Sequence, residues 1–403
     1  MKILRIIARL NVGGPARHVV WLTKALQDDE FQTTLIAGSV PPGEDDMGYF
    51  ADENGVRPVY LREMSREISP SDTRSLLKLY RLIKAEKPDI IHTHTAKAGT
   101  LGRIAGSMYR WLTWGTLVGR PRRIRMVHTF HGHVFHSYYS PAKTRAFLAI
   151  ERTLARATDR IVVLSDQQLD EINKKFRVGN LERFAVVPLG IDIEQFDSDP
   201  SVRQKLRAEF GVQESDVVVG FVGRLTEIKN ISLLLHAAAL IRERKDVKFA
   251  IVGDGHLRPD LEQKAASLDI GSNTIFLGNR SDISDIYSAL DIVALTSLNE
   301  GTPLSLIEAM AAGKPVISTG VGGVRDLLGA VREEYGGFSI CDRGIRVESF
   351  EPADYQAGLT YLVENRQWRA EIAERGRKYI RSRYGKDRLI DDIKRLYREL
   401  NSE

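Results

Sequence analysis

Short apolar runs alternate with longer amphipathic stretches along the first half of the chain. We predict buried strands at the short runs, which are rich in β-branched and aliphatic residues: 2–8, 32–38, 89–94, 125–130, 160–165 and 184–188. Between them apolar residues recur at helical spacing, most clearly at 16–28, 73–87 and 142–157. Strands that alternate with helices indicate a parallel sheet covered on both faces.

The alternation starts again after PLGID (188–192) and a polar stretch. We predict five further strands, at 217–224, 248–254, 274–278, 291–296 and 315–319. From about residue 351 the chain is helical and charged, and its last helix (387–401) is long enough to return to the first domain. The pattern therefore predicts an α/β fold of two doubly wound domains, which are 1–192 together with 385–403, and 193–384. Ligands of such sheets bind at the carboxyl ends of the strands, so we expect one cleft between the two domains.

Composition agrees with a chain of two or three folded domains. The 403 residues are 43% hydrophobic and 28% charged, and Cys341 is the single cysteine, so no internal disulfide can form. We therefore expect the protein to reside in a reducing cytosol. Arg5 and Arg9 interrupt the first apolar stretch, and no run of 18 apolar residues occurs, so we expect neither a signal peptide nor a membrane span.

The net charge of +5 is unevenly distributed. Residues 90–150 contain no Asp or Glu, but nine Lys or Arg and six of the nine histidines. Such a stretch indicates a surface that faces an anion, or simply a basic surface without a role. No nucleic-acid module is visible, and we expect no nucleic-acid partner. Aromatic residues next to arginines suit an anionic bilayer, and here these are Trp111, Trp114, Arg120, Arg122, Arg123 and Arg125.

Several candidate ligand groups follow predicted strands. Gly13 and Gly14 allow a ligand to approach the backbone at a helix start, although a plain tight turn explains them equally well. Arg224 and Lys229 suit a diphosphate, with a solvated surface as the alternative, and we expect Asn230 to cap the next helix. The turns at Gly253 and Gly255 indicate a further ligand loop.

Two acids, Glu300 and Glu308, stand in the apolar segment NEGTPLSLIEAMAAGKPVIST (299–319). We predict a helix that starts at Thr302 and Pro303, with proline at its first position. This helix is apolar nearly all round, so it is buried and Glu308 needs hydrogen-bond donors close by. Ribose hydroxyls would supply them, and a phosphate would sit on the helix N-terminus. Alternatively, amides or an arginine inside the fold satisfy the carboxylate.

Four histidines in HTFHGHVFHS, at 128, 131, 133 and 136, raise the question of a metal site. Their spacing matches neither one helix face nor a zinc pattern, so we expect no metal. Hydrogen bonding of one or two of them to a ligand fits better. The polar residues of HTHTAK (92–97) follow the preceding strand and should line the same rim.

Taken in chain order, several motifs resemble those of the retaining glycosyltransferases of family 4, which have the GT-B fold. These motifs are Gly13-Gly14, HTFHGH (128–133), VVPLGID (186–192), Arg224-x4-Lys229 and Glu300-x7-Glu308. The resemblance implies a nucleotide-sugar donor held mainly by the second domain, an acceptor held mainly by the first, and catalysis without a metal. Two features depart from the family pattern: Pro15-Ala16-Arg17 replaces an acid after the glycines, and 106–124 is long, which we interpret as a membrane-docking element.

The resemblance also assigns roles by position. It implies that Glu308 holds the ribose and that Glu300 and His131 approach the donor sugar. It also implies that the loop at 278–283 binds the nucleotide base through its backbone groups and through Arg280. The diphosphate would be bound by Arg224, Lys229, Gly14 and the backbone of Gly301, Thr302, Pro303 and Leu304, in which every residue except Pro303 has an amide N–H. Preorganised charge of this kind stabilises a departing diphosphate.

The sequence thus predicts a retaining, metal-independent enzyme without a cofactor. It would transfer a hexose or N-acetylhexosamine from a UDP-sugar to a lipid-linked or polysaccharide acceptor in cell-surface glycan synthesis. We expect a cytoplasmic protein that is peripheral at the inner face of the cell membrane. Two alternatives remain, a nucleotide-sugar 2-epimerase and a non-catalytic sugar-nucleotide-binding protein.

Overall fold

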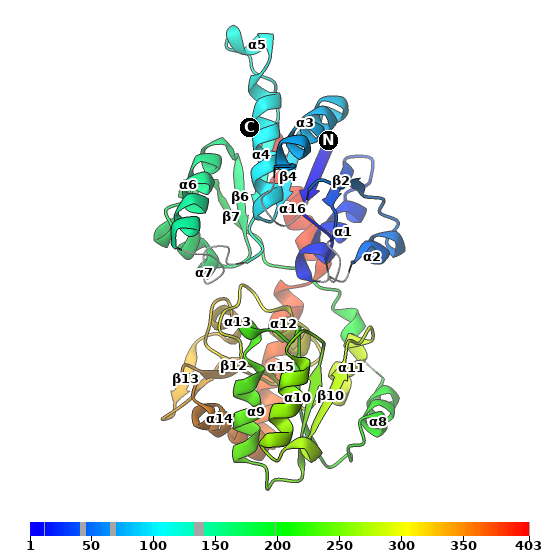
Figure 1. The fold of residues 1–403 in the computed structure, drawn as a ribbon, viewed down its shortest axis with the longest axis vertical. Coiled ribbons are helices and arrows are strands. Elements are labelled where there is room, and N and C mark those ends of the chain that lie inside the picture. The colour runs from blue at the N-terminus through cyan, green and yellow to red at the C-terminus, as the bar shows by residue number, and fades with distance from the viewer. Residues whose placement is uncertain (12, 41–45, 65–69, 133–140, 198, 403) are drawn as a thin grey trace. The chain divides into compact units, whose positions relative to one another are not determined.

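The computed structural model describes residues 1–402 except 12, 41–45, 65–69, 133–140 and 198. The chain divides into two compact units, the first formed by Met1–Gly190 with Lys386–Glu403 and the second by Ile191–Gly385 (Figure 1). Each unit has its own sheet. The chain therefore leaves the first unit once, and its last helix comes back to it.

The sheet of the first unit consists of parallel strands in the order β3-β2-β1-β4-β5-β6-β7. The strands are β1 (Lys2–Ile7), β2 (Gln32–Gly38), β3 (Val59–Leu61), β4 (Ile90–His94), β5 (Arg125–Thr129), β6 (Arg160–Val163) and β7 (Phe184–Val186). The prediction missed β3, a three-residue edge strand that is mostly exposed and so lacks an apolar run. The strand order reverses between β1 and β4, the place where such sheets bind ligands.

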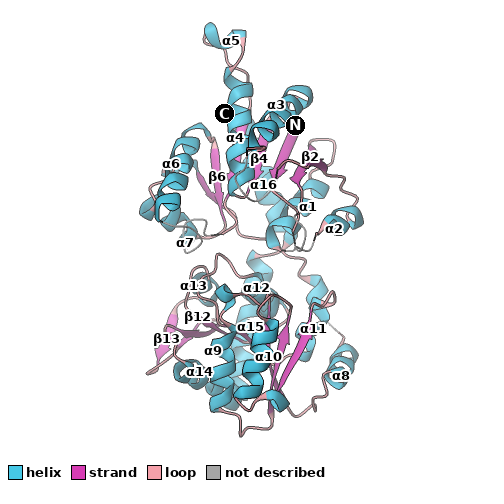
Figure 2. Cartoon of the chain, viewed as in Figure 1, coloured by secondary structure: helices cyan, strands magenta, loops and turns pink. Residues whose placement is uncertain are grey.

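Helices cover both faces of this sheet (Figure 2). The helices and helical turns of the first unit are α1 (Gly14–Ala25), α2 (Gly48–Glu53), α3 (Asp72–Glu86), α4 (Ala96–Trp111), α5 (Trp114–Leu117), α6 (Pro141–Ala157), α7 (Asp166–Leu169), the π-helical turn η1 (Asp170–Lys175), the 3₁₀ turn η2 (Leu181–Arg183) and α16 (Lys386–Ser402). Alternate residues of β1 serve the two faces: Leu4 and Ile6 pack with α3 and α4, whereas Ile3 packs with α1 and α16.

The last helix is held in the first unit by its apolar stripe. Leu389, Ile393, Leu396, Tyr397 and Leu400 recur at helical spacing and are buried in the same core cluster as Ile3. Lys394 and Arg398 on the helix pair with Asp28 and Glu30. The amphipathic pattern explains why the helix returns to this sheet.

The sheet of the second unit has the order β10-β9-β8-β11-β12-β15-β14-β13. Its strands are β8 (Val217–Val222), β9 (Val247–Val252), β10 (Thr274–Gly278), β11 (Ile292–Leu295), β12 (Val316–Thr319), β13 (Val331–Glu334), β14 (Ser339–Cys341) and β15 (Gly344–Val347). The strands β8 to β12 and β15 are parallel, and β14 and β13 add an antiparallel edge. The prediction missed the last three strands, since β13 is charged and exposed and the other two are short.

The second unit has helices η3 (Glu194–Phe196), α8 (Pro200–Glu209), η4 (Glu227–Lys229), α9 (Ile231–Leu240), α10 (Arg258–Ser267), η5 (Gly271–Asn273), α11 (Ile283–Ala289), α12 (Leu304–Ala311), α13 (Val324–Leu328), α14 (Pro352–Glu364) and α15 (Arg366–Arg383), of which η3, η4 and η5 are 3₁₀ turns. Two predictions about helix starts need correction. Pro303 is the N-cap of α12 rather than its first helical residue, because its ψ of 113° is extended. Asn230 is the N-cap of α9, but its side chain makes no cap hydrogen bond.

Candidate active site

The predicted carboxylate Glu300 and the predicted cation Lys229 meet in the second unit. Lys229 follows β8 and Glu300 follows β11, two neighbouring parallel strands whose carboxyl ends lie at one edge of the sheet. Lys229 Nζ lies 2.5 Å from Glu300 Oε1, and the Ser297 hydroxyl donates to the same oxygen at 2.6 Å. Both charged side chains are mostly buried, with exposures of 21% and 11%. The fold of the second unit thus brings the two charges together.

Hydrogen bonds between loops hold this pair in place. The Thr296 hydroxyl donates to the carbonyl of Lys229 at 2.9 Å, and the amide of Leu298 donates to the carbonyl of Ile228 at 2.8 Å. From β12, the Thr319 hydroxyl donates to the carbonyl of Ser297 at 2.6 Å. The loops after β8 and β11 are therefore coupled, and a ligand would meet a preformed edge.

Glu308 lies one turn into α12 and is buried, with 7% of its surface exposed. The hydroxyl of the fully buried Tyr287 on α11 donates to Glu308 Oε2 at 3.1 Å and contacts the carbonyl of Ser305 at the same distance. The fold thus supplies a donor to the carboxylate. The predicted ribose contact stays a prediction.

The glycines at this edge allow loops to approach closely. Gly253 has φ +124°, and a Cβ there would lie 2.1 Å from the carbonyl oxygen of Gly223. Gly301 accepts from the amide of Gly323, where a Cβ would lie 2.0 Å from the same Gly301 oxygen. Gly253 and Gly323 therefore have a packing role, and Gly301 contributes its carbonyl to the contact with Gly323. Thr302, Pro303 and Leu304 follow directly and lead into the first turn of α12. The amides of Leu306 and Ile307 donate to the carbonyl of Pro303, and those of Leu304 and Ser305 precede these first hydrogen bonds of the helix.

The two predicted arginines of the second unit have different surroundings. Arg224 follows β8 at the same edge as Lys229 and is exposed. Arg280 lies in the loop after β10, where Asp282 accepts two of its hydrogen bonds, at 2.7 and 2.8 Å, and Glu209 accepts another. The hydrogen bonds from Arg280 lower the pKa of Asp282. These acids occupy the guanidinium of Arg280, and recognition of the nucleotide base through Arg280 stays a prediction.

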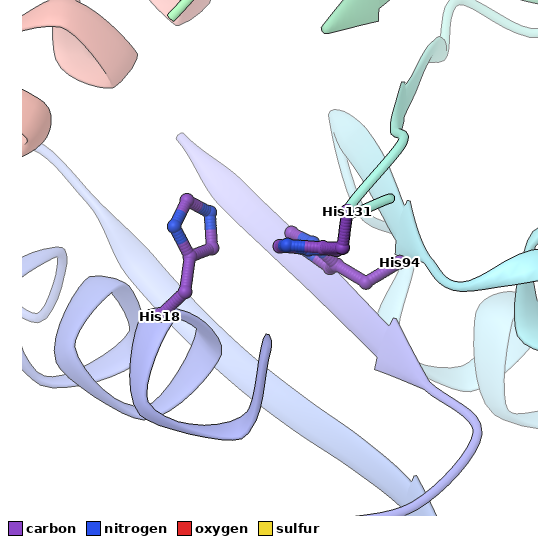
Figure 3. Close-up of side chains that lie close together, drawn as sticks. All are labelled: His18, His94 and His131. Carbon is purple, nitrogen blue, oxygen red and sulfur yellow. The ribbon is translucent and has the colours of Figure 1, made fainter. Parts of the chain in front are cut away.

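In the first unit, His131 follows β5 and Gly14 begins α1 after β1. His131 Nε2 lies 2.9 Å from Nδ1 of His94, the last residue of β4, and the ring of His18 on α1 lies edge-on to His131 at 4.9 Å. Figure 3 shows these three rings pointing toward one another. Burial, and then the charge of Arg5, lowers the pKa of His131 to about 3. The imidazole of His131 is therefore neutral at physiological pH.

Within the described residues, one group of side chains has metal-ligand geometry. Nitrogen atoms of His18, His94 and His131 all lie within 4.8 Å of one another. However, His94 Nδ1 and His131 Nε2 already share a hydrogen bond, and Nη1 of the buried Arg5 lies 3.3 Å from Nε2, the other ring nitrogen of His94. A cation there would be repelled by the guanidinium. The arrangement fits a hydrogen-bonded network, and the absence of a metal stays a prediction. His133 and His136 lie outside the described residues.

The predicted membrane element continues α4 into α5, which extends beyond the sheet of the first unit (Figure 1). Trp114 is 87% exposed and Trp111 49%, next to the exposed Leu112, Leu117 and Val118. Arg120 and Arg123 are exposed, whereas Arg122 stacks on Tyr109 and Arg125 pairs with Asp159. Nothing in the part of the chain that the structure describes forms a helix long and apolar enough to cross a bilayer.

Sequence reasoning singled out neither Arg5 nor His18, nor Tyr287. Signals for the first two were present: Arg5 interrupts the apolar strand KILRII and His18 stands on the apolar face of α1. Both are buried, with exposures of 0% and 2%. No local signal could have found Tyr287, because its partner Glu308 is 21 residues away and only the packing of α11 on α12 brings them together.

Comparison with known families covers nearly the whole chain in two parts. Residues 12–195 match the family described as Glycosyltransferase Family 4, and residues 202–379 match the family described as Glycosyl transferases group 1. The chain is 32% identical to the UDP-Gal:alpha-D-GlcNAc-diphosphoundecaprenol alpha-1,3-galactosyltransferase of Escherichia coli, covering 78% of this chain and 77% of that protein. It is 29% identical to a D-inositol 3-phosphate glycosyltransferase of Corynebacterium urealyticum, covering 77% and 72%.

Solved structures share the fold at lower identity. The Anabaena protein Alr3699/HepE, crystallised with UDP, superposes with a TM-score of 0.78 at 22% identity, covering 99% of this chain and all of that one. Sucrose-phosphate synthase from Thermosynechococcus elongatus superposes with a TM-score of 0.79 at 18% identity over the full length of both chains. With two family matches in the expected order and a relative above 30% identity, the chain belongs to the glycosyltransferases of family 4 and has their two-domain GT-B fold.

Proposed function

We propose that this enzyme transfers a hexose or N-acetylhexosamine from a UDP-sugar to a lipid-linked acceptor, with retention at the anomeric carbon and without a metal. The observation that carries the proposal is the Lys229–Glu300 pair at the strand ends of the second unit. The Escherichia coli relative is named for galactosyl transfer to a sugar on diphosphoundecaprenol. UDP-galactose and a GlcNAc-diphosphoryl lipid are therefore the first substrates to test.

The chemistry assigned to the second unit follows from its charges. Lys229, Arg224 and the free amides at the start of α12 suit a diphosphate, and they neutralise the charge that grows as it leaves. The Lys229 ammonium has three donors, so it can hold Glu300 and a phosphate oxygen together. Glu300 would then face the sugar and stabilise positive charge at the anomeric carbon. Glu308, to which the Tyr287 hydroxyl donates, would accept hydrogen bonds from the ribose hydroxyls.

The first unit would bind the acceptor, and its residues His131 and Gly14 would contact the donor. The exposed apolar tip formed by Trp111, Leu112, Trp114, Leu117 and Val118, with its neighbouring arginines, supports docking on an anionic membrane surface. A lipid-linked acceptor presents its sugar at such a surface. We infer that the enzyme acts at the cytoplasmic face of the cell membrane, in the synthesis of a cell-surface glycan.

Binding and turnover separate the roles of the two carboxylates. Thermal-shift titrations with UDP and UDP-sugars should show stabilisation of the wild type. Glu308→Gln should weaken UDP binding about tenfold, since a charged hydrogen bond contributes roughly 1.5–3 kcal/mol. Glu300→Gln should keep UDP affinity within about threefold and lower kcat at least about 100-fold. Glu243→Gln, at an exposed surface carboxylate, is the matched control.

The products decide among the remaining alternatives. NMR of the transferred sugar should show the same anomeric configuration as the donor, and a chelator should leave the rate unchanged. Sugar epimerised in the absence of acceptor would indicate an epimerase, and binding without any turnover would indicate a sensor. If no nucleotide sugar stabilises the protein, the proposal fails.

A further inference from the structure

Arg5 is a buried cation at the centre of the sheet of the first unit. It is fully buried on β1, and its Nη1 lies 3.2 Å from His92 Nδ1 and 3.3 Å from His94 Nε2. Its Nε and Nη2 make no hydrogen bond to any of the described residues. A guanidinium is always charged and can only donate. Arg5 therefore dictates the proton positions of the histidines that it contacts.

The constraint passes from Arg5 to His94. Because Arg5 can only donate, His94 Nε2 must accept, and a neutral His94 then carries its proton on Nδ1. Burial, followed by the neighbouring histidines and Arg5, holds the pKa of His94 well below its usual value, so the ring is neutral. His94 Nδ1 lies 2.9 Å from His131 Nε2. The Nδ1–H of His94 thus donates to His131.

The same reasoning determines the proton on His131. Its Nε2 accepts from His94, so the neutral ring must carry its proton on Nδ1. That nitrogen is buried and has no hydrogen-bond partner among the described residues. A buried N–H without an acceptor costs free energy that a ligand oxygen would recover. A metal ion finds no lone pair at Nδ1 of His131 or of His94 in this arrangement.

We propose that Arg5 and His94 are positioning residues that hold His131 as the Nδ1–H tautomer, so that it donates a hydrogen bond to an oxygen of the donor sugar. The inference rests on the proposed function for the identity of that oxygen. The tautomer itself depends only on contacts within the first unit. Arg5 donates to His94, and His94 donates to His131. These two hydrogen bonds leave the proton of His131, at the end of β5, on Nδ1.

Two replacements of His94 test the direction of this chain. In His94→Asn the side-chain oxygen can accept from Arg5 while the amide nitrogen donates to His131, which preserves the direction. In His94→Asp both oxygens accept, so His131 must donate from Nε2 and its Nδ1 becomes an acceptor. The two variants have the same size, so a change in packing alone would affect both alike. Asp also adds a charge beside Arg5, and the tautomer of His131 reports the direction of the hydrogen bonds separately from that charge.

The first measurement needs no substrate. Two-bond ¹⁵N–¹H correlation spectra of histidine-labelled full-length protein identify the protonated nitrogen, and His131→Gln assigns the resonance. We expect Nδ1–H for His131 in the wild type and in His94→Asn, and Nε2–H in His94→Asp. Observation of Nε2–H in the wild type overturns the proposal, even if the proposed transfer reaction is correct.

The second measurement is the rate of sugar transfer. We expect kcat of His94→Asn within about fivefold of the wild type and kcat of His94→Asp at least about 100-fold lower, with UDP affinity unchanged in both. Tyr397→Phe removes the hydrogen bond to His92, at 2.6 Å, and the interaction with Arg5, but leaves the contact of Arg5 with His94 in place, so it should keep both the tautomer and the rate. Equal rates in the two His94 variants would overturn the catalytic part. If no variant and no wild type transfers sugar, the proposed function fails, while the spectra still decide the tautomer.

Discussion

The Arg103–Glu151 pair joins α4 to α6 inside the first unit. Arg103 Nη2 donates to both oxygens of Glu151, at 2.7 and 2.8 Å, and its Nε donates to the carbonyl of Gly99 at 2.8 Å. The side chains are only 1% and 4% exposed. Because neither charge can reach water, each depends on the other.

Removal of one partner of this pair should therefore be costly. We expect Glu151→Gln to lower the free energy of unfolding by about 3 kcal/mol, because it leaves a buried guanidinium without its counter-charge. The double replacement Arg103→Met with Glu151→Met should cost less than the single change, since no unpaired charge remains. Urea unfolding of the full chain measures both.

An exposed pair provides the control for this experiment. Asp170 and Lys174 are 57% and 69% exposed at a distance of 2.7 Å, so Asp170→Asn should change stability by less than about 0.5 kcal/mol. Equal losses from Glu151→Gln and from Asp170→Asn would show that burial does not set the strength of the Arg103–Glu151 pair.

At the scale of elements, the tip made by the end of α4 and by α5 exposes apolar side chains. These are Trp111, Leu112, Trp114, Leu117 and Val118, with exposures between 49% and 87%. The side chain of Thr113 caps α5 by accepting from the amide of Gly115, and the amide of Arg120 donates to the carbonyl of Gly115. The tip is therefore an ordered turn that exposes apolar groups.

Membrane docking predicts a specific loss on mutation of the tip. The wild type should float with vesicles that contain anionic lipid, and Trp111→Ala with Trp114→Ala should lower the partition coefficient about tenfold or more, because the buried apolar area is lost. Arg120→Ser with Arg123→Ser should weaken binding to anionic vesicles only. Leu77→Ser, at another exposed apolar position, is the control. Unchanged flotation of the tryptophan variant would refute docking through the tip.

At the scale of the whole molecule, the two units differ in their buried titratable groups. Among the residues that the structure describes, burial holds the pKa values of five histidines below the usual value, and all five lie in the first unit: His18, His92, His94, His128 and His131. The unfolded chain takes up protons at these positions near pH 6.5, whereas the folded unit does not. The stabilisation is therefore complete above pH 6.5 and is lost as the pH falls below it.

We accordingly expect the first unit to unfold before the second in mild acid. Each histidine should cost about 1 kcal/mol at pH 5.5 relative to pH 7.5. Pulse proteolysis at the two pH values, with the fragments identified by mass spectrometry, locates the unit that opens. His128→Gln should reduce the loss of unfolding free energy between pH 7.5 and pH 5.5 by about 1 kcal/mol, the contribution of one histidine. Earlier opening of the second unit would contradict this prediction.

Much of the fold could be predicted because it is encoded locally. The predicted strands of both units agree with the observed ones within about two residues, and α16 was expected from its amphipathic pattern. The strands that were missed, β3 and β13 to β15, are short or exposed, so burial leaves no apolar period in their sequence. The start of α12 was misplaced because the conformation of Pro303 depends on the loop before it.

The sequence by itself determined the alternation of strands and helices, the two sheets, the family and the acids and cations at the strand ends. These are properties of residue order, since apolar period and glycine position act over a few residues. Only the tertiary structure decided which groups meet: Lys229 with Glu300, Tyr287 with Glu308, Arg5 with His94, and His94 with His131. Such contacts join residues 21 to 89 positions apart, and the parallel register and helix packing that create them are properties of the whole folded unit.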